Sequence, residues 1–167
     1  MLTEVSLIQR LVLFLGQPVL SMAVFLFSPL GGAGLGSLRS NRVAREEIHR
    51  WIAKAFLLVA VLALCYTFLL PVLFDQILEL DLAIRLLITV LLVTPLGFLM
   101  GFPFPLGIRL LKETGNERQI PWMRGVNGVS SVLGSGITVV AALTIGFTGA
   151  LLIAVGCYFT IFVILGF

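Results

Sequence analysis

Charged side chains are scarce in this sequence. Asp, Glu, Lys and Arg make up 11% of its 167 residues, whereas hydrophobic residues make up 59%. An ordinary soluble domain carries about 25% charged residues. A single core of this size cannot hide so much apolar surface from water. The composition, with a mean hydropathy of +1.14, therefore excludes an ordinary soluble domain and indicates that lipid surrounds much of the chain.

Residues that bind metals or form nucleophile–base pairs are also few. The chain has one histidine and two cysteines. His49 lies beside Arg50 in a basic segment, which indicates a solvated side chain rather than a zinc ligand. Cys65 and Cys157 lie inside apolar runs, where cysteine serves as a small packing residue. We therefore expect no catalytic residue, no cofactor, no metal site and no enzymatic activity of this chain by itself.

Long stretches carry no charge at all. Residues 11–38, 55–74, 86–108 and 125–167 lack Asp, Glu, Lys and Arg. A membrane-spanning helix needs ~20 mostly apolar residues, and these continuous runs lack the alternation of transmembrane β-strands. The sequence thus predicts an all-α fold, a polytopic transmembrane helix bundle that forms a single domain over residues 1–167.

We expect about six helices in this bundle, the last two divided by GFTG at 146–149. Their ranges are about 2–15, 18–38, 48–74, 82–102, 121–145 and 148–167. The first would reach only ~21 Å, less than the ~30 Å hydrocarbon core, so it is short or truncated. Its Glu4 argues against a signal peptide, whose first residues are basic.

Prolines interrupt the predicted spans. Pro71 and Pro95 fall within helices and are expected to kink or loosen them. The run GFPFPLG at 101–107 must break the fourth helix, because each proline pushes the preceding residue out of the α conformation. Residues 105–115 are then predicted to form a short interfacial helix that ends at Gly115.

Charges gather in the connections between spans. Segments 39–54 and 109–124 are basic, whereas the connection 75–81 is acidic. Two spans separate the basic segments, so both lie on one side, which the positive-inside rule assigns to the cytoplasm. We expect an integral protein of the cytoplasmic (inner) membrane, whose net charge of +3 reports orientation rather than a nucleic-acid partner.

The glycine-rich stretch SPLGGAGLGSLRSNR at 28–42 resembles a phosphate-binding turn in composition. A dinucleotide fingerprint follows a strand and opens a helix, whereas these glycines close an apolar span. Gly32 and Gly36 instead form a GxxxG pair, which favours close helix packing. Arg39 and Arg42 then mark the cytoplasmic exit of this span.

The fifth predicted helix carries a second stripe of small residues, which also favours tight helix packing. Its members are Gly125, Gly128, Ser131, Gly134 and Ser135. Asn127 adds a polar group near the inner edge of the membrane. Its side chain either forms a structural hydrogen bond to a neighbouring helix or contacts a substrate, and both interpretations stay open.

Glu4 and Arg10 are the ionisable candidates in the first helix. Ionisable groups within a membrane are candidates for function. On one helix the two side chains point ~120° apart, so they are poor partners for each other. A functional role and a structural role, by pairing elsewhere or by snorkelling, both remain possible interpretations.

Four segments of the chain form an ordered set: TEVSLIQRLVLFLGQP at 3–18, GLGSLRSNR at 34–42, GFPFPLGIRLL at 101–111 and IPWMRGVNGVSSVLGS at 120–135. Together they resemble the C-terminal membrane region of polytopic spermidine-synthase-like proteins. The resemblance implies membrane helices fused to a soluble aminopropyltransferase-like domain with a SAM-binding fold, and an internal position for Met1. That soluble domain and its catalytic residues have no counterpart in this sequence.

Two functions follow as hypotheses. The resemblance implies the membrane domain of a spermidine-synthase-like, polyamine-related protein, non-catalytic by itself, that anchors or serves a missing soluble domain. The alternative is a small secondary transporter, or half of one, that works as an oligomer. In either case we expect the partners to be the lipid bilayer and other membrane helices, from further copies or from a missing N-terminal part.

Overall fold

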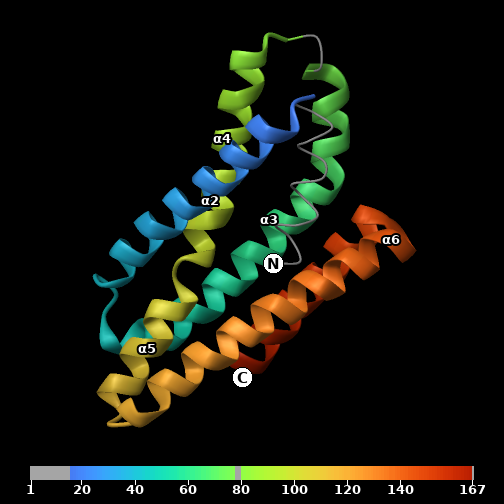
Figure 1. The fold of residues 1–167 in the computed structure, drawn as a ribbon. Helices are drawn as coiled ribbons and strands as arrows, with labels where there is room; N and C mark the ends of the chain where they lie inside the picture. Colours follow the sequence, from blue (N-terminus) through green and yellow to red (C-terminus); the bar gives the residue numbers. More distant parts are fainter. Residues whose placement is uncertain (1–15, 78–79, 167) are drawn as a thin grey trace.

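The computed structural model describes residues 16–77 and 80–166, and every regular element in these ranges is a helix (Figure 1). Five helical stretches are long and apolar enough to cross a membrane. The predicted all-α class is confirmed, and the chain has the helices of a membrane protein. The helix predicted at about 2–15, with Glu4 and Arg10, lies outside the described residues.

Short connections join the helices. The elements are α2 (Pro18–Ser40), η1 (Arg45–Glu47), α3 (Ile48–Ile77), α4 (Leu82–Met100), α5 (Pro103–Glu113), η2 (Glu117–Gln119) and α6 (Ile120–Gly166). α2 therefore runs to Ser40 rather than to residue 38. α3 stays helical through position 71 and ends beyond the predicted residue 74.

The predicted break in the fourth helix occurs around Gly101. α4 ends at Met100 and α5 begins at Pro103. Proline suits the first turn of a helix, where no intrahelical N–H bond is needed. α5 ends at Glu113, and Gly115 follows with a φ of +74°, the left-handed conformation that often closes a helix.

α6 consists of two helical halves that meet at Gly146. This residue has a φ of 78° and a ψ of 169°, a combination that is essentially restricted to glycine. The spans on either side are Glu117–Gly146 and Thr148–Leu165. The second half returns alongside the first (Figure 1), so the chain reverses where GFTG predicts a division.

α2 and α4 run parallel and touch through their backbones (Figure 1). A Cβ added at Gly32 would lie 2.8 Å from the Phe98 nitrogen, and one at Gly101 would lie 2.8 Å from a Cα of α2. Gly36 and Gly97 are crowded by backbone atoms in the same way. The glycine pair predicted in α2 therefore faces a second pair in α4, with no space for side chains between them.

Two apolar clusters join α3 to its neighbours, the first to α2 and α4, and the second to the connection after α2 and to α5 with the residue before it. The first contains Phe25, Val59, Tyr66, Val93 and Leu96, and the second contains Val43, Ile48, Ala55, Phe102 and Leu106. In the first cluster the Tyr66 hydroxyl donates a hydrogen bond to the Leu92 carbonyl of α4. This bond satisfies the phenol within apolar surroundings and links α3 to α4.

The two basic segments meet at one end of the bundle. The end of α2, helix α5 and the start of α6 all lie there (Figure 1), and we call it the basic end. A hydrogen bond from Arg109 to the Ser40 carbonyl joins the two segments directly. This agrees with the prediction that 39–54 and 109–124 share one side.

The two cysteines correct one expectation. Cys65 and Cys157 are exposed, so the prediction that they are packing residues is wrong for the described chain. Successive residues of a helix point ~100° apart. Tyr66 is the residue that α3 directs toward α4, and this turns its neighbour Cys65 away from that contact.

The α2–α4 contact predicts opposite effects for two glycine-to-alanine changes on α2. Gly36→Ala places a methyl group against the α4 backbone, and such overpacking costs ~1–3 kcal/mol. Gly34 has open space around it, so Gly34→Ala gains up to ~1 kcal/mol from helix propensity. Thermal unfolding of the purified chain in detergent measures both. Equal melting temperatures for the two variants would contradict the backbone contact.

The turn at Gly146 predicts a similar contrast on α6. Gly146→Ala forces alanine into a glycine-only conformation, which costs ~1–3 kcal/mol. Gly136→Ala, in an open helical position, should leave the stability unchanged or raise it. Chemical denaturation followed by circular dichroism compares the two, and an unchanged midpoint for Gly146→Ala would mean that α6 has no such turn.

Candidate functional site

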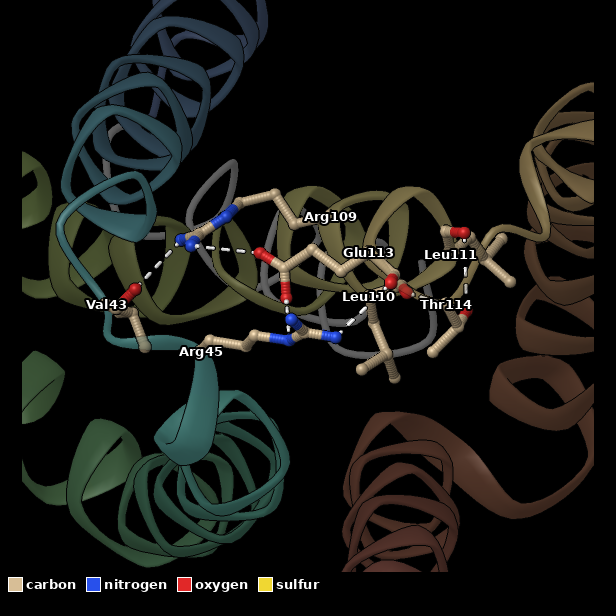
Figure 2. A network of polar contacts seen from close by, with 7 residues as sticks. All are labelled: Val43, Arg45, Arg109, Leu110, Leu111, Glu113 and Thr114. Atoms are coloured by element: carbon tan, nitrogen blue, oxygen red, sulfur yellow. Dashed lines mark hydrogen bonds and ion pairs between the residues drawn. The ribbon is translucent and has the colours of Figure 1, made fainter.

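Arg109 of α5 reaches the end of α2 (Figure 2). Its Nη1 donates hydrogen bonds to the carbonyls of Ser40 at 2.8 Å and Val43 at 3.1 Å. The last carbonyls of a helix have no partners within it, and they form the negative end of the helix dipole. The Arg109 guanidinium therefore caps α2 from a different helix.

Glu113 contacts two arginines from separate parts of the chain (Figure 2). Its Oε1 lies 3.6 Å from Nη2 of Arg109, one helical turn away, and its Oε2 lies 3.3 Å from Nε of Arg45. The second contact is an ion pair without an aligned hydrogen bond. Nη2 of Arg45 also donates to the Glu113 main-chain carbonyl at 3.3 Å. The network joins η1 to α5 and α5 to α2, and we call it the arginine clasp.

The two arginines do not contribute equally to the clasp. The Arg45 side chain is 69% exposed, whereas those of Arg109 and Glu113 are 26% exposed. Exposed ion pairs contribute only ~0–1 kcal/mol, whereas a hydrogen bond to a charged group contributes ~1.5–3 kcal/mol. Arg109 is therefore the main link, and Arg45 adds a weaker, salt-sensitive one.

The last turn of α5 is capped by a side chain that directly follows the helix. The Thr114 hydroxyl donates to the carbonyls of Leu110 at 2.9 Å and Leu111 at 3.3 Å (Figure 2). The same carbonyls also accept main-chain N–H bonds, Leu110 from Thr114 and Leu111 from Asn116. The bonds hold the end of α5 in place, and with it Glu113, from which both arginines take their position.

Aromatic side chains support the basic end. Trp51 of α3 stacks on Phe102, with ring centroids 5.9 Å apart, and Phe98 meets Phe102 edge-on at 5.1 Å. The indole N–H of Trp51 donates to the Glu47 carboxylate at 3.3 Å, and Lys54 Nζ lies 5.8 Å from the ring centroid. An apolar ring face with a polar edge is typical of tryptophan at a membrane interface.

The clasp supplies positioning rather than bond chemistry. It consists of two guanidinium groups, a carboxylate and main-chain carbonyls, and guanidinium stays protonated in proteins. Within residues 16–77 and 80–166, no cluster of three or more His, Cys, Asp and Glu side chains could hold a metal ion. His49 is exposed at the start of α3. The arrangement can therefore hold two connections together and fix the shape of this end.

The small-residue stripe of α6 does not form one contact face. A Cβ at Gly125 or Gly128 would meet no heavy atom within 4 Å. The remaining members, Ser131, Gly134 and Ser135, are partly buried. Steps of three residues turn back by ~60° on a helix of ~3.6 residues per turn, so the stripe winds around α6. Packing of Gly125 and Gly128 against a further helix stays a prediction.

Of the polar candidates from the sequence, Asn127 is the one that lies within the described residues. Asn127 is exposed near the start of α6. Glu4 and Arg10 fall outside the described residues, so their roles stay predictions. Trp122, within the basic segment 109–124, is 77% exposed.

The sequence interpretation missed two features that local spacing could have indicated. Gly97 and Gly101 have the same spacing of four as the glycine pair of α2, but the proline-rich break beside them hides that pattern. Arg109 and Glu113 have the (i, i+4) spacing of a helical ion pair within the predicted segment 105–115. Neither spacing indicates which residue of another helix the pair contacts.

Comparison of the chain with protein-family models, with curated proteins and with solved structures finds no match. The resemblance to the membrane region of spermidine-synthase-like proteins therefore depends on the four sequence segments alone. What the structure adds is where the last three of those segments lie, because most of the first, 3–18, is outside the described residues.

Because Arg109 and Arg45 contribute unequally to the clasp, their replacement should cost unequal amounts of stability. Arg109→Ala removes both hydrogen bonds to the α2 end and should cost ~2–4 kcal/mol. Arg45→Ala removes an exposed ion pair and should cost less than ~1 kcal/mol. Thermal unfolding in detergent at low and high salt checks this, because salt weakens only the exposed pair strongly. Equal losses from the two variants would contradict the ranking.

Proposed function

We propose that this chain is the membrane domain of a spermidine-synthase-like protein, non-catalytic by itself, that anchors a soluble aminopropyltransferase-like domain. The position of the resembling segments supports this. Arg109 of the third segment donates to Ser40 of the second, and Met123 of the fourth lies against Gly107 of the third. Three of the four segments therefore meet at the basic end, which is the surface that a soluble domain would contact.

The charge pattern supports a cytoplasmic position for the basic end in the inner membrane. Its exposed charged side chains are Arg39, Arg42, Arg45, Glu46, Glu47, Arg50, Lys54, Lys112, Glu117, Arg118 and Arg124, an excess of basic over acidic groups. The clasp and the α2–α4 backbone contact hold the elements that carry these residues. A surface of fixed shape favours an anchoring role, because a docked domain then loses less conformational freedom on binding.

A small secondary transporter, or half of one working as an oligomer, is the second candidate. The feature that favours it is the ion pair between Arg45 and Glu113, which ties η1 to α5 across the basic end. Such an exposed pair costs little to open. In alternating access one bundle rocks against another, and this pair would close the cytoplasmic side in one state.

The anchoring proposal is tested in the source organism by removing the coding region of residues 1–167. Aminopropyltransferase activity is then measured in the membrane and soluble fractions. We expect most of the membrane-bound activity to move to the soluble fraction, because the catalytic domain loses its attachment. Return of the wild-type region should restore the original distribution.

Two results would count against anchoring. One is an activity distribution that does not change when the region is removed. The other is uptake of polyamines by liposomes that contain the purified chain, above that of protein-free liposomes. The second result would favour the transporter, and Arg45→Ala, which opens the ion pair, should then change the uptake rate.

A further inference from the structure

A shallow hollow of about 230 Å³ lies at the end of α2. It is lined by Leu35, Leu38, Arg39 and Arg42. Leu35, Leu38 and Arg39 lie in the last turns of α2, and Arg42 lies in the turn directly after its end at Ser40. The hollow therefore combines two leucine side chains with two guanidinium groups.

The two arginines of the hollow, Arg39 in α2 and Arg42 just after it, are not part of the clasp. Arg45 and Arg109 share Glu113. Among the described residues, neither Arg39 nor Arg42 has an ion pair or a side-chain hydrogen bond. Two unpaired guanidinium groups side by side repel each other, and an anion between them would remove this repulsion.

The end of α2 does not supply that anion. A helix C-terminus carries a partial charge of about −0.5, and two guanidinium groups exceed it. The Ser40 and Val43 carbonyls, moreover, already accept hydrogen bonds from Arg109. The net charge of the hollow is therefore positive, which favours a ligand with a negative group.

The position of the hollow along α2 indicates what else the ligand carries. α2 has 23 residues, which gives ~34 Å at ~1.5 Å per residue and matches a ~30 Å hydrocarbon core. Arg39 lies in its last turn, at the level of the lipid headgroups. Leu35, one turn earlier, and Leu38, the residue directly before Arg39, are 58% and 68% exposed. Leu35 lies at the depth at which acyl chains begin, and Leu38 lies between it and the headgroup level.

We propose that this hollow binds an anionic phospholipid from the cytoplasmic leaflet. Arg39 and Arg42 hold the phosphate by charge-assisted hydrogen bonds, and Leu35 and Leu38 contact the first part of an acyl chain. The site needs only the purified chain in a lipid environment. It is independent of the proposed anchoring role, so failure of one does not imply failure of the other.

Native mass spectrometry of the purified chain in neutral detergent tests the site, with phosphatidylglycerol and phosphatidylcholine as probes. We expect the wild type to bind phosphatidylglycerol more tightly than phosphatidylcholine. The double variant Arg39→Gln/Arg42→Gln should weaken phosphatidylglycerol binding by about 30-fold, the factor for two basic residues at an anionic surface. All four lining side chains are at the surface, so we expect unchanged melting temperatures.

The matched control is Arg118→Gln/Arg124→Gln, which removes the same charge from exposed positions at the same end. It should change phosphatidylglycerol binding by much less. Equal weakening by the two double variants would overturn the proposal, because it would show a general effect of charge. Equal binding of the two lipids by the wild type would overturn it without any variant.

The leucines and a soluble competitor separate a lipid site from a phosphate site. Leu35→Ala/Leu38→Ala should weaken phosphatidylglycerol binding while the arginines remain. Glycerol phosphate, which has no acyl chains, should compete only at much higher concentration. If it displaced phosphatidylglycerol at equal concentration, the hollow would bind a soluble phosphate compound, and the lipid proposal would be wrong.

Discussion

The backbone contact between α2 and α4 is the constraint on which the rest of the fold depends. Gly32 and Gly36 meet Gly97 and Gly101 with no room for a Cβ, so the two parallel helices are fixed in register. In lipid there is little hydrophobic gain from joining apolar helices, and close van der Waals packing has to supply the attraction. α3 connects the two helices, packs against α4 and α6, and shares one apolar cluster with Phe25 of α2.

This register also decides which charges meet at the basic end. α4 ends at Met100, and Gly101 directly after it touches the α2 backbone. α5 then carries Arg109 to the Ser40 carbonyl at the end of α2. Glu113, one turn further, draws Arg45 to the same place. Because Glu113 pairs with Arg45 and Arg109, Arg39 and Arg42 stay without an ion-pair partner among the described residues. These are the two arginines for which we propose a lipid phosphate. One set of basic residues thus stabilises the fold, and the other is available to a ligand.

The two glycine patterns show what residue spacing can and cannot predict about helix packing. Gly32 and Gly36, four residues apart in an uncharged run, share a face, and that face meets α4. Gly125 and Gly128, three apart, begin a stripe that winds around α6, and open space surrounds both. The spacing of residues indicates which side chains share a face of a helix. It does not indicate whether another helix packs against that face.

By itself, the sequence determined the helices and most of their ends, because these depend on local chemistry: the length of apolar runs, the missing N–H of proline and the conformational freedom of Gly146. It also placed the basic segments together, since each span reverses the chain. Only the tertiary structure decided which helices touch and which arginine finds which carbonyl. Arg109 and Ser40 are 69 positions apart, and their meeting depends on the shapes of packed surfaces that no local pattern encodes.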